Sequence, residues 1–165
     1  MHHPEYFASI LAFVRRIGIA VELQPISGPS FLPGIVIRSG ALVVDPDTLQ
    51  WPGDLLHEAG HLAVLPPERR AGASDDLSDT SIPGGGELEA LAWSFAAAHR
   101  LGLPPSVLFH PGGYKGQSEG LILSYTFGVC PGLKGLCEAG MATAPGFGSI
   151  ATAPPYPHMI RWLRI

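Results

Sequence analysis

The feature that most constrains this chain is a pair of histidines four residues apart, His57 and His61, set in the mostly apolar stretch LLHEAGHLAV. On an α-helix, residues four apart lie one above the other, so the two imidazoles face a single point. This geometry is typical of the first two protein ligands of a zinc ion. Glu58 projects about 100° around the helix from His57, which points it toward a water held by the metal. The pattern therefore predicts a metal-activated water with Glu58 as the general base.

The five residues HEAGH can also occur by chance on an ordinary helix, with both histidines solvated or hydrogen-bonded to neighbours. Here Leu55, Ala59 and Leu62 form the opposite face of the helix, so the helix is expected to be buried. Burying two imidazoles and a carboxylate without partners is costly, and a bound metal is the simplest partner. We therefore expect a zinc site on this helix.

The composition indicates one compact domain over residues 1–165, with a core at about 5–105 and a Gly/Pro-rich extension over 106–165. Hydrophobic residues make up 46% of the 165 residues and charged residues 15%, which is typical of a globular protein. The net charge of −4 and the absence of a basic stripe argue against a nucleic-acid partner.

Localisation follows from the termini, the apolar runs and the cysteines. No basic segment precedes the first apolar stretch, so we expect no signal peptide, and no apolar run reaches the 18 residues of a membrane span. The single pair Cys130 and Cys137 is too little for a zinc ribbon, so both are expected to be reduced thiols. These features predict a cytoplasmic protein.

Periodicity and turn residues predict an α+β fold with an N-terminal helix, a small sheet, the metal helix and further helices. Ser39-Gly40, between two β-branched runs, predicts a two-residue hairpin turn. The expected elements are a helix over 4–17, a strand over 19–25, hairpin strands over 34–38 and 41–45, the metal helix after Pro52, a polar loop over 68–86, a helix over 87–101, short helices over 117–127 and 133–141, and a segment at 156–162 that packs back on the core.

A catalytic zinc ion normally has three protein ligands, and the second strong helix offers Glu87 and Glu89. Glu89 shares a side of the helix with Ala92 and Ala96, whose small side chains permit a close approach to the metal helix. Glu87 lies in the first turn, where an acidic residue already complements the helix dipole. This favours Glu89 as the third ligand and leaves Glu87 as the alternative. Loop carboxylates are a weaker choice, namely Asp75, Asp76 and Asp79.

The segment Glu89-x-x-Ala92-x-x-Phe95-Ala96, followed by Leu103-Pro104, resembles the signature that follows HExxH in ImmA/IrrE-type zincins. The resemblance covers roughly residues 5–105. It implies a zincin-like, gluzincin-type fold in which His57, His61 and Glu89 bind zinc and Glu58 is the general base. It also implies a bacterial, cytoplasmic metallopeptidase that cleaves a regulatory protein such as a repressor.

The leading functional hypothesis is therefore a zinc-dependent peptidase acting on a peptide or protein, with an extended substrate paired to the hairpin over 35–44. Two alternatives stay open, a non-catalytic module that keeps the metal for stability and a hydrolase of small amides. Glu58 favours catalysis, because a purely structural site has no use for a carboxylate beside the metal. The sequence does not choose the residue that stabilises the oxyanion from its candidates, which are His110, Tyr114, Tyr125, Tyr156 and His158.

Overall fold

A computed structural model describes residues 1–28, 30–74, 86–147 and 153–165, and it shows the expected mixture of helices with one small sheet. A 3-10 turn, η1 (Pro4–Tyr6), leads into the first helix, α1 (Phe7–Arg16). The apolar face of α1 is buried, and the Arg15 side chain donates a hydrogen bond to the carbonyl oxygen of Val21 at 2.8 Å. This bond ties the end of α1 to the start of the sheet.

The sheet has three strands, β1 (Val21–Leu23), β2 (Ile35–Arg38) and β3 (Ala41–Val44), in the order β1-β3-β2. The central strand β3 runs parallel to β1 and antiparallel to β2. The hairpin turn has left-handed backbone at both Ser39 and Gly40, with φ of 47° and 76°, which matches the right-handed twist of paired strands. The predicted hairpin is therefore confirmed, with β2 at one edge of the sheet.

The predicted metal helix is α2 (Pro52–Val64). Pro52 occupies its first turn, where a missing N–H costs nothing, and Asp54 lies in the same turn. Its C-terminal carbonyls are bound by Arg70, whose guanidinium donates to the oxygens of Leu62 and Leu65 at 2.9 Å each. These bonds satisfy groups that the end of a helix leaves without partners.

Arg70 belongs to a short helix, α3 (Pro67–Arg70), in a region predicted to be entirely loop. The prediction for residues 68–86 is thus wrong at its start, because Pro67 begins a helical turn that lets Arg70 reach the end of α2. The remainder of that loop, from 75 to 85, lies outside the described residues and includes Asp75, Asp76 and Asp79.

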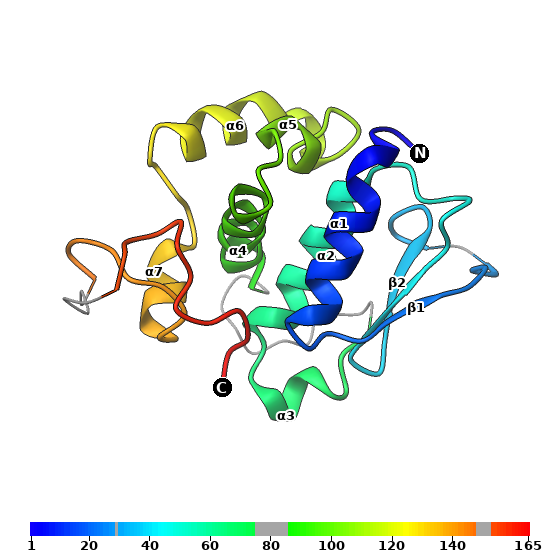
Figure 1. Ribbon diagram of the computed structural model, residues 1–165, viewed down its shortest axis with the longest axis horizontal. Helices are drawn as coiled ribbons and strands as arrows, with labels where there is room; N and C mark the ends of the chain where they lie inside the picture. The colour runs from blue at the N-terminus through cyan, green and yellow to red at the C-terminus, as the bar shows by residue number, and fades with distance from the viewer. Residues whose placement is uncertain (29, 75–85, 148–152) are drawn as a thin grey trace.

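The helix α4 (Glu87–Arg100) packs along α2 on the side away from the sheet (Figure 1). The two helices are in close contact at Gly60, where a Cβ atom would lie 2.8 Å from the carbonyl oxygen of Ala90. At the same contact, the Ser94 hydroxyl of α4 donates a hydrogen bond of 3.0 Å to the carbonyl oxygen of Leu56 in α2. A glycine facing two small residues thus sets the distance between the helices that carry the candidate ligands.

The chain beyond residue 104 covers α4 with short helices and returns to the core (Figure 1). Trp93 in α4 donates its indole N–H to the carbonyl oxygen of Trp162 at 2.9 Å, and the Arg164 N–H bonds to the carbonyl oxygen of Ala63. The predicted return of the C-terminal segment to the core is confirmed. The elements of this region are α5 (Pro105–Leu108), η4 (Tyr114–Gly116), α6 (Ser118–Thr126) and α7 (Leu133–Glu138).

Within the described ranges, no helix combines the length and the apolar character needed to cross a membrane.

Candidate metal centre

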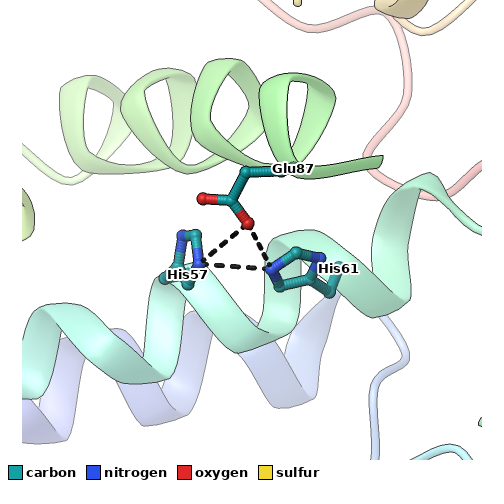
Figure 2. Close-up of side chains that lie close together, drawn as sticks. All are labelled: His57, His61 and Glu87. Carbon is teal, nitrogen blue, oxygen red and sulfur yellow. Dashed lines mark hydrogen bonds and ion pairs between the residues drawn. The ribbon is translucent and has the colours of Figure 1, made fainter. Parts of the chain in front are cut away.

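Two imidazoles from α2 and one carboxylate from α4 converge on a single point (Figure 2). The Nε2 atoms of His57 and His61 lie 3.2 Å apart. Glu87 Oε2 lies 3.7 Å from His57 Nε2 and 3.1 Å from His61 Nε2. The histidine side chains are only 13% and 11% exposed, whereas that of Glu87 is 48% exposed, so the group sits at the rim of the α2–α4 contact.

The three distances match the donor spacing of a small divalent ion. Ligands about 2.0–2.1 Å from a tetrahedral zinc ion lie about 3.3–3.4 Å from one another, which is the edge of that tetrahedron. The observed separations of 3.1, 3.2 and 3.7 Å bracket this value. Within the described part of the chain, this is the group of His, Cys, Asp or Glu side chains placed to share a metal ion.

Glu87, rather than the predicted Glu89, lies beside the histidines. The small residues that let α4 approach α2 are Ala90 and Ser94, which share the face of Glu87 at three and seven residues' distance. The face of α4 that carries Glu89, Ala92 and Ala96 is therefore not the face that meets α2 at Gly60, and the prediction of Glu89 beside the histidines is wrong. Glu89 is directed to α7 instead, where a Cβ atom at Gly135 would overlap its carboxylate.

The electrostatics of the group leave its donor atoms available to a cation. Burial, reinforced by the neighbouring His61, lowers the pKa of His57 to about 4, although Glu87 and Asp54 act in the opposite direction. The hydrogen bond from His61 holds the pKa of Glu87 below its usual value and outweighs the effect of burial. Near neutral pH, the site thus presents a neutral His57 ring and an ionised Glu87 carboxylate.

Glu58 lies on α2 directly after His57, half-buried and outside the group of three converging side chains. This is the placement expected of a carboxylate that acts on a ligand of the metal and not on the metal itself. Its negative charge acts on the Tyr114 hydroxyl, together with the charges of Asp54 and Glu87. Burial is the largest cause of the raised pKa of Tyr114, and these three carboxylates raise it further.

A wall of aromatic and polar side chains borders the group on the side of His57. Asp54, one turn before His57, accepts a hydrogen bond of 2.8 Å from His110 Nε2, and both side chains are buried. The His110 ring stacks on Trp51 with their centroids 4.5 Å apart. The Tyr114 ring meets the His57 ring edge to face, with centroids 5.8 Å apart. Loop residues far from α2 in sequence thus complete the surroundings of the histidines.

The loop that carries Tyr114 has an unusual backbone. Tyr114 and Lys115 both have left-handed φ values, of 56° and 51°. For residues with a Cβ atom this conformation costs about 1–2 kcal/mol each, and such strain concentrates at functional sites. The preceding Gly112 and Gly113 pack directly on Trp51 and His110, where side chains would collide. The loop therefore holds Tyr114 against His57 at an energetic cost.

The other oxyanion candidates are occupied or lie elsewhere. The hydroxyl of Tyr125 donates to the carbonyl oxygen of Pro131 at 2.7 Å, and that of Tyr156 donates to Ala92 at 2.8 Å. His158 is exposed and lies near His99 at the far end of α4, with ring centroids 6.4 Å apart. Of the predicted candidates, His110 and Tyr114 lie beside the metal ligands.

Comparisons with known protein families, curated proteins and solved structures gave no match for this chain.

Proposed function

We propose that this protein is a zinc-dependent hydrolase that cleaves peptide bonds, with zinc held by His57, His61 and Glu87. The observation that carries the proposal is the convergence of these three side chains at separations that suit a tetrahedral ion, with Glu58 next to the first of them. A His₂Glu set with one remaining position is the ligand set of catalytic zinc sites, whereas structural zinc sites are closed by four protein ligands, mainly cysteines. The two cysteines, Cys130 and Cys137, are not part of the group.

Zinc bound at such a site supplies a Lewis acid for the scissile carbonyl and lowers the pKa of a water molecule. Glu58 accepts a proton from this water as its oxygen adds to the carbonyl carbon. The same carboxylic acid then gives the proton to the amide nitrogen as the C–N bond breaks. The second proton of the water follows to the amine, so the products are a carboxylate and an ammonium, and Glu58 returns to its starting state.

An extended peptide is the substrate that suits the position of the sheet. The strand β2 lies at an edge of the sheet and contacts α2, whereas both edges of β3 are already paired, with β1 and with β2. Backbone pairing along β2 is the expected mode of binding, as in other proteins that add a peptide strand to a sheet. A repressor protein is the first substrate to try, by the resemblance to ImmA/IrrE-type zincins, although the signature glutamate of that resemblance is Glu89 and the residue beside the histidines is Glu87.

The proposal is tested by Glu58→Gln, which keeps the size of the side chain but removes its ability to accept a proton near neutral pH. We expect the variant to bind zinc normally and to hydrolyse internally quenched peptides at least about 10²-fold more slowly than the wild type, within the usual range for acid–base catalysis. The control is Glu119→Gln, at an exposed position on α6, which should behave as the wild type.

Unchanged hydrolysis by Glu58→Gln would refute the catalytic role of this carboxylate. Loss of zinc and of thermal stability in the same variant, without hydrolysis by the wild type, would favour the alternative of a metal-stabilised binding module.

A further inference from the structure

Three buried polar atoms have no hydrogen-bond partner within the described part of the chain, and all three lie beside the metal group. They are His57 Nδ1, His110 Nδ1 and the Tyr114 hydroxyl. The rings that carry them are neighbours, since the Tyr114 centroid lies 5.8 Å from that of His57 and 5.7 Å from that of His110. Buried polar atoms are nearly always paired, so a cluster of unpaired ones points to a group that binds there.

Tyr114 is the member of this cluster whose side chain makes no hydrogen bond at all among the described residues. His57 Nδ1 lies on the far side of a ring whose Nε2 faces Glu87 and His61. His110 is already held by Asp54 through Nε2, and its Nδ1 faces the packed Gly112. The Tyr114 ring is fixed by Phe109 as well as by the two histidines, with the Phe109 centroid 5.4 Å away. A fixed ring with an unpaired hydroxyl is a preorganised hydrogen-bond donor.

We propose that the Tyr114 hydroxyl donates a hydrogen bond to the oxyanion that forms when water adds to the substrate carbonyl. The inference rests on the proposed hydrolytic function and names the residue of this chain that would stabilise the developing charge. A phenol keeps its proton near neutral pH, so Tyr114 donates a hydrogen bond and no proton is transferred. Donors aimed at the position where charge develops give large rate effects, because they need no reorganisation during the reaction.

The left-handed backbone at Tyr114 and Lys115 supports this role. A loop without a function at this point could relax to an ordinary conformation and release the ring. Instead, the strained pair holds Tyr114 over His57, and the positive charge of Lys115 acts on Glu87. Two consecutive loop residues therefore act on two members of the metal group, Tyr114 on His57 and Lys115 on Glu87.

The test uses the full chain loaded with Co²⁺, whose visible spectrum reports the metal geometry and the binding of added ligands without any turnover. Two probes are titrated into the wild type, Tyr114→Phe and Tyr125→Phe. Phenylphosphonate presents tetrahedral oxyanions, whereas azide occupies only the open metal position. Tyr125→Phe is the matched control, because it removes a hydroxyl that is already bonded to Pro131.

We expect Tyr114→Phe to keep the wild-type spectrum, to bind azide as the wild type does, and to bind phenylphosphonate on the order of 10-fold more weakly. This loss corresponds to one hydrogen bond to a charged acceptor. Tyr125→Phe should bind both probes normally. Phosphonate affinity unchanged in Tyr114→Phe would overturn the assignment, as would an equal loss for both probes.

An altered spectrum of Tyr114→Phe before any probe is added would also overturn the assignment, because it would make Tyr114 a metal ligand. Failure of the wild type to take up metal would overturn the proposed function itself. A wild type that binds metal and phosphonate, beside a Tyr114→Phe variant that does so equally well, would remove only the role of Tyr114.

Discussion

Gly60 lies between the two histidines in sequence and sets the distance between α2 and α4, so Gly60→Ala should damage the metal site without changing a ligand. A Cβ atom at this position would lie 2.7 Å from Ser94 Oγ and 2.8 Å from the carbonyl oxygen of Ala90. Ordinary carbon–oxygen contacts are about 3.3–3.6 Å long. The Ser94 hydroxyl can rotate away, but the Ala90 carbonyl is backbone, so the helices must separate by roughly 0.5 Å.

The effect on stability is the difference of two terms. Replacing a glycine by alanine inside a helix favours folding by about 1 kcal/mol, whereas overpacking a close contact costs about 1–3 kcal/mol. The net change is therefore a loss of about 0–2 kcal/mol. Metal binding is affected as well, because a 0.5 Å displacement exceeds the roughly 0.2 Å tolerance of metal–ligand distances. We expect zinc affinity to fall at least about 10-fold, as it does when the residues supporting a metal site are changed.

Two measurements check this prediction, the zinc dissociation constant from competition with a chelator and the melting temperature with and without zinc. The control is Gly120→Ala, at an exposed helical position where a Cβ atom meets nothing within 4 Å. It should stabilise the protein by up to about 1 kcal/mol and leave zinc affinity unchanged. If Gly60→Ala behaves like Gly120→Ala, the close approach of the helices does not determine the site and the reasoning is refuted.

Three further predictions concern protonation, the cysteines and Arg70. In metal-free protein, the pKa of His57 is about 4 when folded and near 6.5 when unfolded, so the unfolded state binds the proton first and the free energy of unfolding should fall by about 3 kcal/mol between pH 6.5 and pH 4. Urea unfolding at several pH values should therefore give a steeper dependence of the unfolding free energy on pH for the wild type than for His57→Gln, and parallel curves would contradict this. Burial raises the pKa of both Cys130 and Cys137, so a thiol reagent at pH 7 should modify two thiols per denatured chain and react more slowly with the native protein; no reactive thiol after denaturation would mean that the two are bridged. Arg70→Met should lower the free energy of unfolding by about 2 kcal/mol and leave zinc affinity unchanged, because it removes charged hydrogen bonds to the carbonyl oxygens of Leu62 and Leu65. An unaltered melting temperature would show that water replaces those bonds.

The sequence predicts most of the scaffold because its signals are local. The hairpin around Ser39-Gly40, the helix after Pro52 and the helix from residue 87 each depend on turn residues and periodicity within one segment. The position of His57 and His61 on one face of α2 follows from the same periodicity. Short helices such as α3 are harder, because Pro67–Arg70 is stabilised by bonds from Arg70 to a neighbouring helix.

The third ligand and Tyr114 depend on how distant segments pack. Glu87 and Glu89 are both acidic residues in the first turn of α4, and only the contact with Gly60 decides which one faces the histidines. The decisive signal is present in the sequence as Ala90 and Ser94 on the Glu87 face, but Ala92 and Ala96 offer an equally small face to Glu89. Tyr114 reaches His57 through a loop with left-handed backbone, which periodicity cannot predict.

The central claim is that α4 supplies Glu87 to a zinc ion held by His57 and His61, and the zinc dissociation constants of Glu87→Gln and Glu89→Gln test it most directly. Both variants lose one negative charge from the same helical turn, so only the position of the carboxylate differs. We expect Glu87→Gln to bind zinc at least about 10-fold more weakly than the wild type, and Glu89→Gln to bind it with unchanged affinity. Loss of zinc in Glu89→Gln with normal binding in Glu87→Gln would contradict the account.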